Sequence, residues 1–156
     1  MSRPKTDRRC GLQSSRPVFV AGLVLLVSAR SSSPVVDDTR ADLEKMQGKW
    51  KIVHCEESGR DVAQLVGVED TIEGPFWRRP NRRTGVYQLR FDPSKDPKWI
   101  DLSADRLGGQ VLKGIYSMNG NKLTICYAYE PELPRPTEFK TMPGVRGYMY
   151  VLERVK

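Results

Sequence analysis

Short runs in which apolar and polar residues alternate recur through the second half of the chain, and turn-forming residues separate them. The clearest pair is Val111–Met118 and Lys122–Tyr129, which flank Asn119-Gly120-Asn121. Asn-Gly between two alternating runs is the strongest short-range signal for a β-hairpin. Because side chains alternate across a strand with a period of two, the pattern predicts strands rather than helices here.

Further extended runs lie on both sides of this hairpin. Alternation begins after Lys49 and predicts that Trp50, Ile52 and His54 share one strand face. The other runs are Val86–Phe91, Trp99–Leu102, Thr137–Thr141 and Gly147–Arg154. Roughly seven or eight strands joined by tight turns predict a mostly β domain, a small antiparallel up-and-down β-barrel, because closure removes exposed sheet edges. A β-sandwich fits the same strand count and is the alternative.

One short helix is predicted before the first strand. Thr39 and the two acids before it can cap the helix. Leu43 and Met46 lie three residues apart, on one helix face, and Gly48 ends the helix. A linker rich in serine, over residues 30–38, is expected to precede it.

Residues 1–29 carry the pattern of an export signal. A basic, polar stretch precedes the apolar run Val18–Val27, whose ten residues are too few to span a bilayer, which takes roughly 20. The small residues at Val27-Ser28-Ala29 suit cleavage by signal peptidase. We therefore expect a signal peptide and an exported protein, periplasmic or secreted, that meets a membrane only through this signal. An uncleaved anchor is the alternative.

The net charge does not by itself indicate a nucleic-acid-binding protein. Residues 1–29 hold five basic residues and one acidic residue, so the rest of the chain carries only +3 of the formal net charge of +7. The hydrophobic fraction of 38% and the charged fraction of 29% are those of a globular domain. Since the domain is only mildly basic, we expect no nucleic-acid partner.

Six segments of the domain, taken together, carry a resemblance to a protein family. They are Asp42–Trp50, Asp92–Leu102, Lys113–Tyr116, Leu123–Ala128, Arg135–Phe139 and Val151–Arg154. As a set they resemble a lipocalin-like domain family that is abundant in planctomycete bacteria and has no assigned function. The resemblance covers about residues 41–156. It implies a calycin-type barrel for the domain, which we place at residues 39–156, and it implies no activity.

Gly48, Trp50 and Arg154 have a further counterpart among lipocalins. Gly48-Lys49-Trp50 resembles the Gly-x-Trp motif that opens those proteins, in which the tryptophan plugs the closed end of the barrel. A basic residue at the end of the last strand lies over that tryptophan, and Arg154 occupies the matching place. The resemblance implies that these residues are structural and that Arg154 stacks on a buried Trp50, within about 6 Å of the ring centroid.

Histidine and cysteine offer few candidates for chemistry. His54 is the one histidine of the chain, and a metal site needs two or three partners at workable spacing. We therefore predict no metal site and no cofactor. Cys55 and Cys126 either pair in an oxidising compartment or remain as two small buried residues, and the sequence leaves both possibilities open.

Two carboxylates are candidates for catalytic acids. Glu138 and Asp101 are the candidates for a hydrolase, but glycosidase chemistry needs two carboxylates about 5–9.5 Å apart, and nothing in the sequence places these together. The preferred interpretation is an ion pair of Glu138 or Asp101 with Arg135 or Lys113. We predict no catalytic residue and a protein that is not an enzyme.

Arginine and aromatic residues are concentrated between residues 76 and 83. Such a segment can bind an anionic polymer or an envelope component by stacking and by bidentate contacts. The candidate residues for a surface interaction are Phe76, Trp77, Arg78, Arg79, Arg82 and Arg83. The preferred interpretation is a solvated loop between two strands, with Phe76 and Trp77 turned into the core.

The chain has six tyrosines, and alternation directs several of them inward. A phenol suits either a pocket in a barrel mouth or plain core packing. The candidate ligand-binding residues are Tyr87, Tyr116, Tyr127 and Tyr150. The leading hypothesis is an exported, monomeric, lipocalin-like binding module for a small apolar or amphipathic molecule. The alternatives are an envelope interaction protein with a filled barrel, acting through residues 76–83, and a hydrolase.

Overall fold

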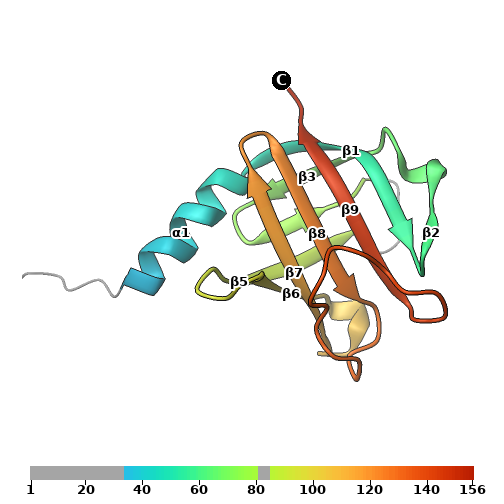
Figure 1. Ribbon diagram of the computed structural model, residues 1–156. Helices are drawn as coiled ribbons and strands as arrows, with labels where there is room; N and C mark the ends of the chain where they lie inside the picture. Colours follow the sequence, from blue (N-terminus) through green and yellow to red (C-terminus); the bar gives the residue numbers. More distant parts are fainter. Residues whose placement is uncertain (1–33, 81–84) are drawn as a thin grey trace, which may run out of the picture. The chain divides into compact units, whose positions relative to one another are not determined.

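The computed structural model describes residues 34–80 and 85–156, and the side chains from residue 38 on. The predicted signal peptide lies outside these residues. The elements are α1 (Pro34–Met46), β1 (Gly48–Glu57), β2 (Arg60–Asp61), η1 (Ala63–Leu65), β3 (Glu69–Glu73), β4 (Phe76–Arg78), β5 (Val86–Asp92), β6 (Lys98–Ser103), η2 (Asp105–Leu107), β7 (Val111–Asn119), β8 (Lys122–Ala128) and β9 (Gly147–Arg154) (Figure 1). No helix among the described residues is long and apolar enough to cross a membrane.

Eight antiparallel strands close into a barrel. From β3 to β9 each strand pairs with the next in sequence, and β1 closes the ring by pairing with both β3 and β9. The two-residue strand β2 pairs only with the end of β1. The predicted up-and-down barrel is thereby confirmed, and the sandwich alternative is wrong.

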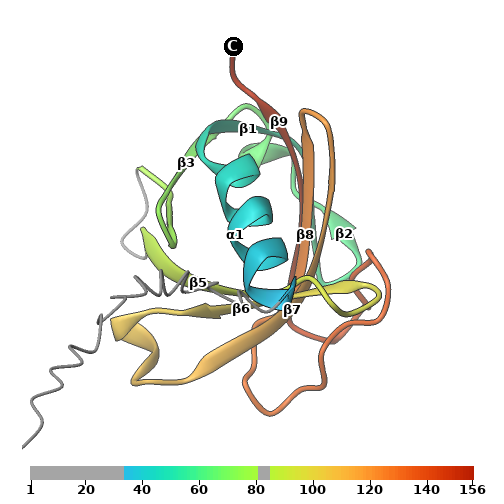
Figure 2. The same ribbon diagram turned by 90° about the vertical axis from the view of Figure 1, so that its left-hand side faces the viewer.

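Helix α1 lies across one end of the barrel (Figure 2). It begins at Pro34, earlier than the expected Thr39, and proline suits the first turn because the N–H it lacks would have no partner there. Gly48 follows the helix with a φ of +110°, which favours glycine. A Cβ at this position would lie 3.2 Å from Nη1 of Arg154, so the turn into β1 is tight.

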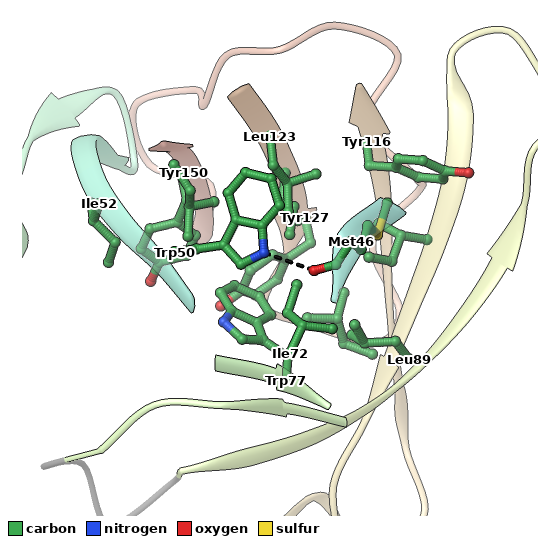
Figure 3. Close-up of a cluster of buried hydrophobic side chains, with 14 of the residues drawn as sticks. Met46, Trp50, Ile52, Ile72, Trp77, Leu89, Tyr116, Leu123, Tyr127 and Tyr150 are labelled. Atoms are coloured by element: carbon green, nitrogen blue, oxygen red, sulfur yellow. Dashed lines mark hydrogen bonds between the residues drawn. The ribbon is translucent and has the colours of Figure 1, made fainter. Parts of the chain in front are cut away.

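Trp50 plugs the barrel end that α1 covers. Its side chain is fully buried, and its indole Nε1 donates a 2.7 Å hydrogen bond to the carbonyl of Met46 (Figure 3). The guanidinium carbon of Arg154 lies 4.3 Å from the centroid of the Trp50 ring. Arg154 also donates to the carbonyls of Lys45 and Gln47 at the end of the helix. The predicted contact between Trp50 and Arg154 is confirmed.

Strands β3 and β4 are missing from the sequence prediction because their inward positions are partly polar. Ile72 and Trp77 face the core, but Asp70 and Arg79 occupy the neighbouring inward positions and pair there. Two charged residues inside the barrel therefore hide the apolar alternation. Conversely, the strand predicted over residues 137–141 is wrong, since this segment is part of an irregular loop.

A β-bulge in β1 changes which residues face the core. The register with β9 shifts between Ile52 and His54, so Val53 is the extra residue. Ile52 and Cys55 consequently belong to the core cluster, whereas His54 moves to the outer face. The prediction that His54 shares a face with Trp50 and Ile52 is wrong for this reason.

Side chains fill the middle of the barrel. The buried cluster includes Trp50, Ile52, Ile72, Trp77, Leu89, Leu102, Leu112, Tyr116, Leu123, Ile125, Tyr127, Tyr150 and Leu152 (Figure 3). Cys55 is part of this cluster, while Cys126 lies on the outer side of β8. Strand β9 separates the two cysteines, and they form no disulfide.

Candidate functional site

The segment between β8 and β9, residues 129–146, forms a belt across the outside of the barrel (Figure 1). Arg135 contacts β6 and β7, and Phe139 packs on an outer cluster from β7, β8 and β9. Beyond Phe139, the backbone N–H and hydroxyl of Thr141 both donate to Glu56 in β1. The belt therefore crosses the outer faces of five neighbouring strands.

Arg135 anchors the belt. Its Nη2 lies 2.7 Å from a carboxylate oxygen of Asp101, and its Nη1 donates to the carbonyls of Ile100 and Gly114 at 3.0 and 2.5 Å. The guanidinium carbon lies 4.4 Å from the centroid of the Trp99 ring. The predicted ion pair between Asp101 and Arg135 is confirmed, and it joins segments that carry the family resemblance.

Replacing Arg135 with lysine is expected to lower the free energy of unfolding by about 2 kcal/mol, because lysine keeps the charge but loses the planar fork and the stack. Arg146→Lys is the matched control, since Arg146 is an exposed arginine of the same belt and should change stability by less than about 0.5 kcal/mol. Urea unfolding measures both. Equal losses in the two variants would mean that the belt is anchored elsewhere.

A pocket of about 450 Å³, open to solvent on one side, lies between the belt and the barrel wall. Its floor is the outer side of β8 from Cys126 to Ala128. Its apolar walls are Leu133, Pro134, Pro136, Met142 and Val145. Small-molecule sites occupy roughly 300–1,000 Å³ and are mostly apolar, with a few polar groups. In size and lining the pocket fits that class.

The charges around this pocket are mostly paired. Arg135 is held by Asp101, and Lys140 pairs with Glu138 at 2.5 Å. Arg146 stacks on Tyr129, with its guanidinium carbon 4.7 Å from the ring centroid. Among the described residues Arg146 forms no ion pair with a carboxylate. It is thus the cation at the pocket that a ligand can engage.

Cys126, at the floor of the pocket, is a protonated thiol at neutral pH. Burial raises its pKa to about 11, although its sulfur also contacts the carbonyl oxygen of Lys140 at 3.5 Å. The thiolate is the nucleophilic form of cysteine, so a thiol in this state is a poor nucleophile. The floor of the pocket is suited to packing rather than to covalent chemistry.

The four tyrosines predicted to bind a ligand lie in or beside the filled interior. Tyr116, Tyr127 and Tyr150 are buried, and the hydroxyl of Tyr116 donates to Asp42 of α1 at 2.8 Å. Tyr87 is half-buried and packs on this cluster. Tyr127 is the one of the four that also lines the pocket under the belt. Ligand binding by these tyrosines stays a prediction.

The arginine-rich segment divides between the two sides of the barrel wall. Phe76 and Arg78 are exposed, so the expectation that Phe76 turns into the core is wrong. Trp77 and Arg79 point inward and are not surface-interaction residues, which corrects the prediction. Arg82 and Arg83 lie outside the described residues. Binding of an anionic polymer through the exposed part of this segment stays a prediction.

Inside the barrel, Arg79 and Asp70 form a buried ion pair. The guanidinium Nη2 and Nε lie 2.7 and 2.9 Å from the Asp70 carboxylate, whose side chain is fully buried. Asp70 also accepts from the indole N–H of Trp77, and Arg79 donates to the hydroxyl of Tyr150. Burial alone would lower the pKa of Arg79, but Asp70 and Tyr150 raise it above its usual value, so the guanidinium stays charged.

A second pocket, of about 430 Å³, lies outside the barrel over β4 to β7. Its lining mixes the exposed apolar residues Phe76, Val86 and Val111 with charged residues such as Arg90 and Asp105. Asp101, which holds Arg135, also lines it. Because its lining carries charges of both signs, this pocket is less suited to an apolar ligand than the pocket under the belt.

The belt pocket was missed at the sequence level. Residues 129–146 hold Arg135 and Glu138, which were singled out, but not Met142, Val145 or Arg146. The feature of the sequence that could have revealed the pocket is the length of the segment between β8 and β9, because loops beyond roughly 12–15 residues are usually functional or disordered. Comparison with protein-family models, with curated proteins and with solved structures finds no match. The lipocalin-like resemblance therefore stays a prediction.

Proposed function

We propose that this chain is an exported, lipocalin-like binding module whose ligand occupies the pocket under the belt rather than the barrel interior. The observation that carries the proposal is an apolar pocket of about 450 Å³ on the wall of a barrel whose interior positions hold side chains. The two candidate carboxylates for hydrolysis, Asp101 and Glu138, form ion pairs with Arg135 and Lys140, which favours binding over hydrolysis.

The lining of the pocket selects an amphipathic ligand. Apolar walls from the belt favour a hydrocarbon body, and Arg146 at the pocket favours a carboxylate or a similar anionic group. A volume of about 450 Å³ equals that of about fifteen water molecules in the liquid, so the ligand has roughly ten to fifteen non-hydrogen atoms. A medium-chain fatty acid has these properties.

A fluorescent medium-chain fatty acid titrated into the protein tests this function. Val145→Trp places bulk in the pocket and should weaken binding at least about tenfold, or about 1.4 kcal/mol. Val86→Trp is the matched control: it makes the same change at an exposed valine of the second pocket, and it should leave binding unchanged.

The charge of the head group is tested separately. Arg146→Gln should weaken binding of the fatty acid by about tenfold and leave binding of the corresponding alcohol unchanged, because only the acid is anionic. If the two valine variants bind the fatty acid equally, the pocket under the belt is not the ligand site. If Arg146→Gln weakens acid and alcohol alike, the arginine has a structural role.

A further inference from the structure

Three side chains with metal-ligating atoms converge on the outside of the hairpin formed by β1 and β2. Glu56 and Asp61 lie directly opposite one another in the register of this hairpin. His54 is two residues before Glu56 on the same strand, and the bulge at Val53 places it on the outer face. The ligating atoms of His54, Glu56 and Asp61 all lie within 4.8 Å of one another.

The electrostatics of this cluster favour a cation. Like charges directly opposite each other across two strands destabilise the pair. A divalent cation between the two carboxylates would replace their repulsion by attraction.

Hydrogen bonds also set the orientation of the Glu56 carboxylate. Both hydrogen bonds from Thr141 reach Oε1 of Glu56, which orients the carboxylate and leaves Oε2 for a metal bond. Such outer partners fix ligands at metal sites. His54 Nε2 and Asp61 Oδ1 lie 3.8 Å apart, beyond a direct hydrogen bond but close to the separation of two ligands on one metal ion.

We propose that His54, Glu56 and Asp61 form a binding site for a divalent transition metal, with Zn²⁺ as the best fit. One imidazole and two carboxylates are ligands that zinc accepts, with bond lengths of about 2.0–2.2 Å. The ligating atoms lie within 4.8 Å of one another, so rotation of these side chains toward one ion would bring all three to such lengths. The bound ion would hold the β1–β2 hairpin closed and, through Glu56 and Thr141, fix the end of the belt.

Isothermal titration of the full, untagged chain with Zn²⁺ alone tests the site. The tag must be absent because His54 is the one histidine of the chain. The parent should bind one Zn²⁺ per chain, and His54→Ala and Asp61→Asn should each weaken binding at least about tenfold. Asp105→Asn is the control, since Asp105 is an exposed carboxylate elsewhere on the barrel, and it should bind as the parent does.

The single imidazole provides a second readout. Zinc should shift the side-chain NMR resonances of His54 in the parent and in Asp105→Asn, but much less in Asp61→Asn. The proposal is overturned if the parent does not bind one zinc ion per chain. It is also overturned if the His54→Ala variant binds zinc as tightly as the parent does. In either case the three residues form only an ion-pair cluster. Circular dichroism confirms that the variants are folded.

Discussion

Trp50→Ala is expected to lower the free energy of unfolding by about 3–5 kcal/mol, which is a large share of the stability of a small domain. The substitution removes a fully buried indole and leaves a cavity at the end of the barrel. It also leaves Arg154 without the ring on which it stacks and the Met46 carbonyl without its donor. Packing, stacking and hydrogen bonding are therefore lost together.

Trp99→Ala is the matched control for this experiment. Trp99 lies on the outer face and is 38% exposed, and the guanidinium of Arg135 stacks on its ring. Its loss should therefore lower the free energy of unfolding by only about 1 kcal/mol. Urea unfolding, followed by circular dichroism, compares the two variants with the parent. Similar losses in the two variants would show that Trp50 does not plug the barrel as its geometry indicates.

Arg79→Met is expected to cost about 3–5 kcal/mol, because it leaves the Asp70 carboxylate buried without a counter-charge. Arg78→Met is a stringent control, since it makes the same change one residue earlier at an exposed arginine. That side chain forms a 3.7 Å ion pair with Glu73 and lies 5.6 Å from the centroid of the Phe76 ring, both at the surface, and should contribute less than about 1 kcal/mol. Equal effects of the two substitutions would contradict the assignment of Arg79 to the interior.

A double variant separates charge from packing. Asp70→Asn combined with Arg79→Met removes both charges and keeps an acceptor for the Trp77 indole, so it should recover most of the stability that Arg79→Met loses. For the same reason, a test of anionic-polymer binding by the arginine-rich segment should leave Arg79 intact. Substituting it would destabilise the barrel and lower binding indirectly.

The barrel and the helix before it were predictable because their signals are local. The hairpin at Asn119-Gly120 and the alternating runs on either side specify strands without tertiary information. The position of Arg154 over Trp50 came from the resemblance to lipocalins, and residues so distant in sequence meet because β1 and β9 are neighbours. The resemblance supplied a contact that alternation alone could not.

The features that the sequence did not predict depend on interactions between distant segments. Asp70 in β3 and Arg79, directly after β4, are inward charges whose burial is tolerable only because they neutralise each other, and neither segment shows this alone. The bulge that turns His54 outward arises from pairing with β9. The proline-rich belt was predicted in part as a strand, over residues 137–141, because the local pattern does not show that Arg135 and its partners on β6 and β7 set the position of this segment.

A ligand that travels with the protein would be decisive for the proposed binding function. Native mass spectrometry of the protein recovered from its own cells should show a population heavier than the bare chain by the mass of one small molecule. Collisional activation should release it as an anion, and Val145→Trp should lack the heavier population while Val86→Trp retains it. A bare-chain mass for the parent, together with no binding of the fluorescent fatty acid, would contradict a binding module with its site under the belt.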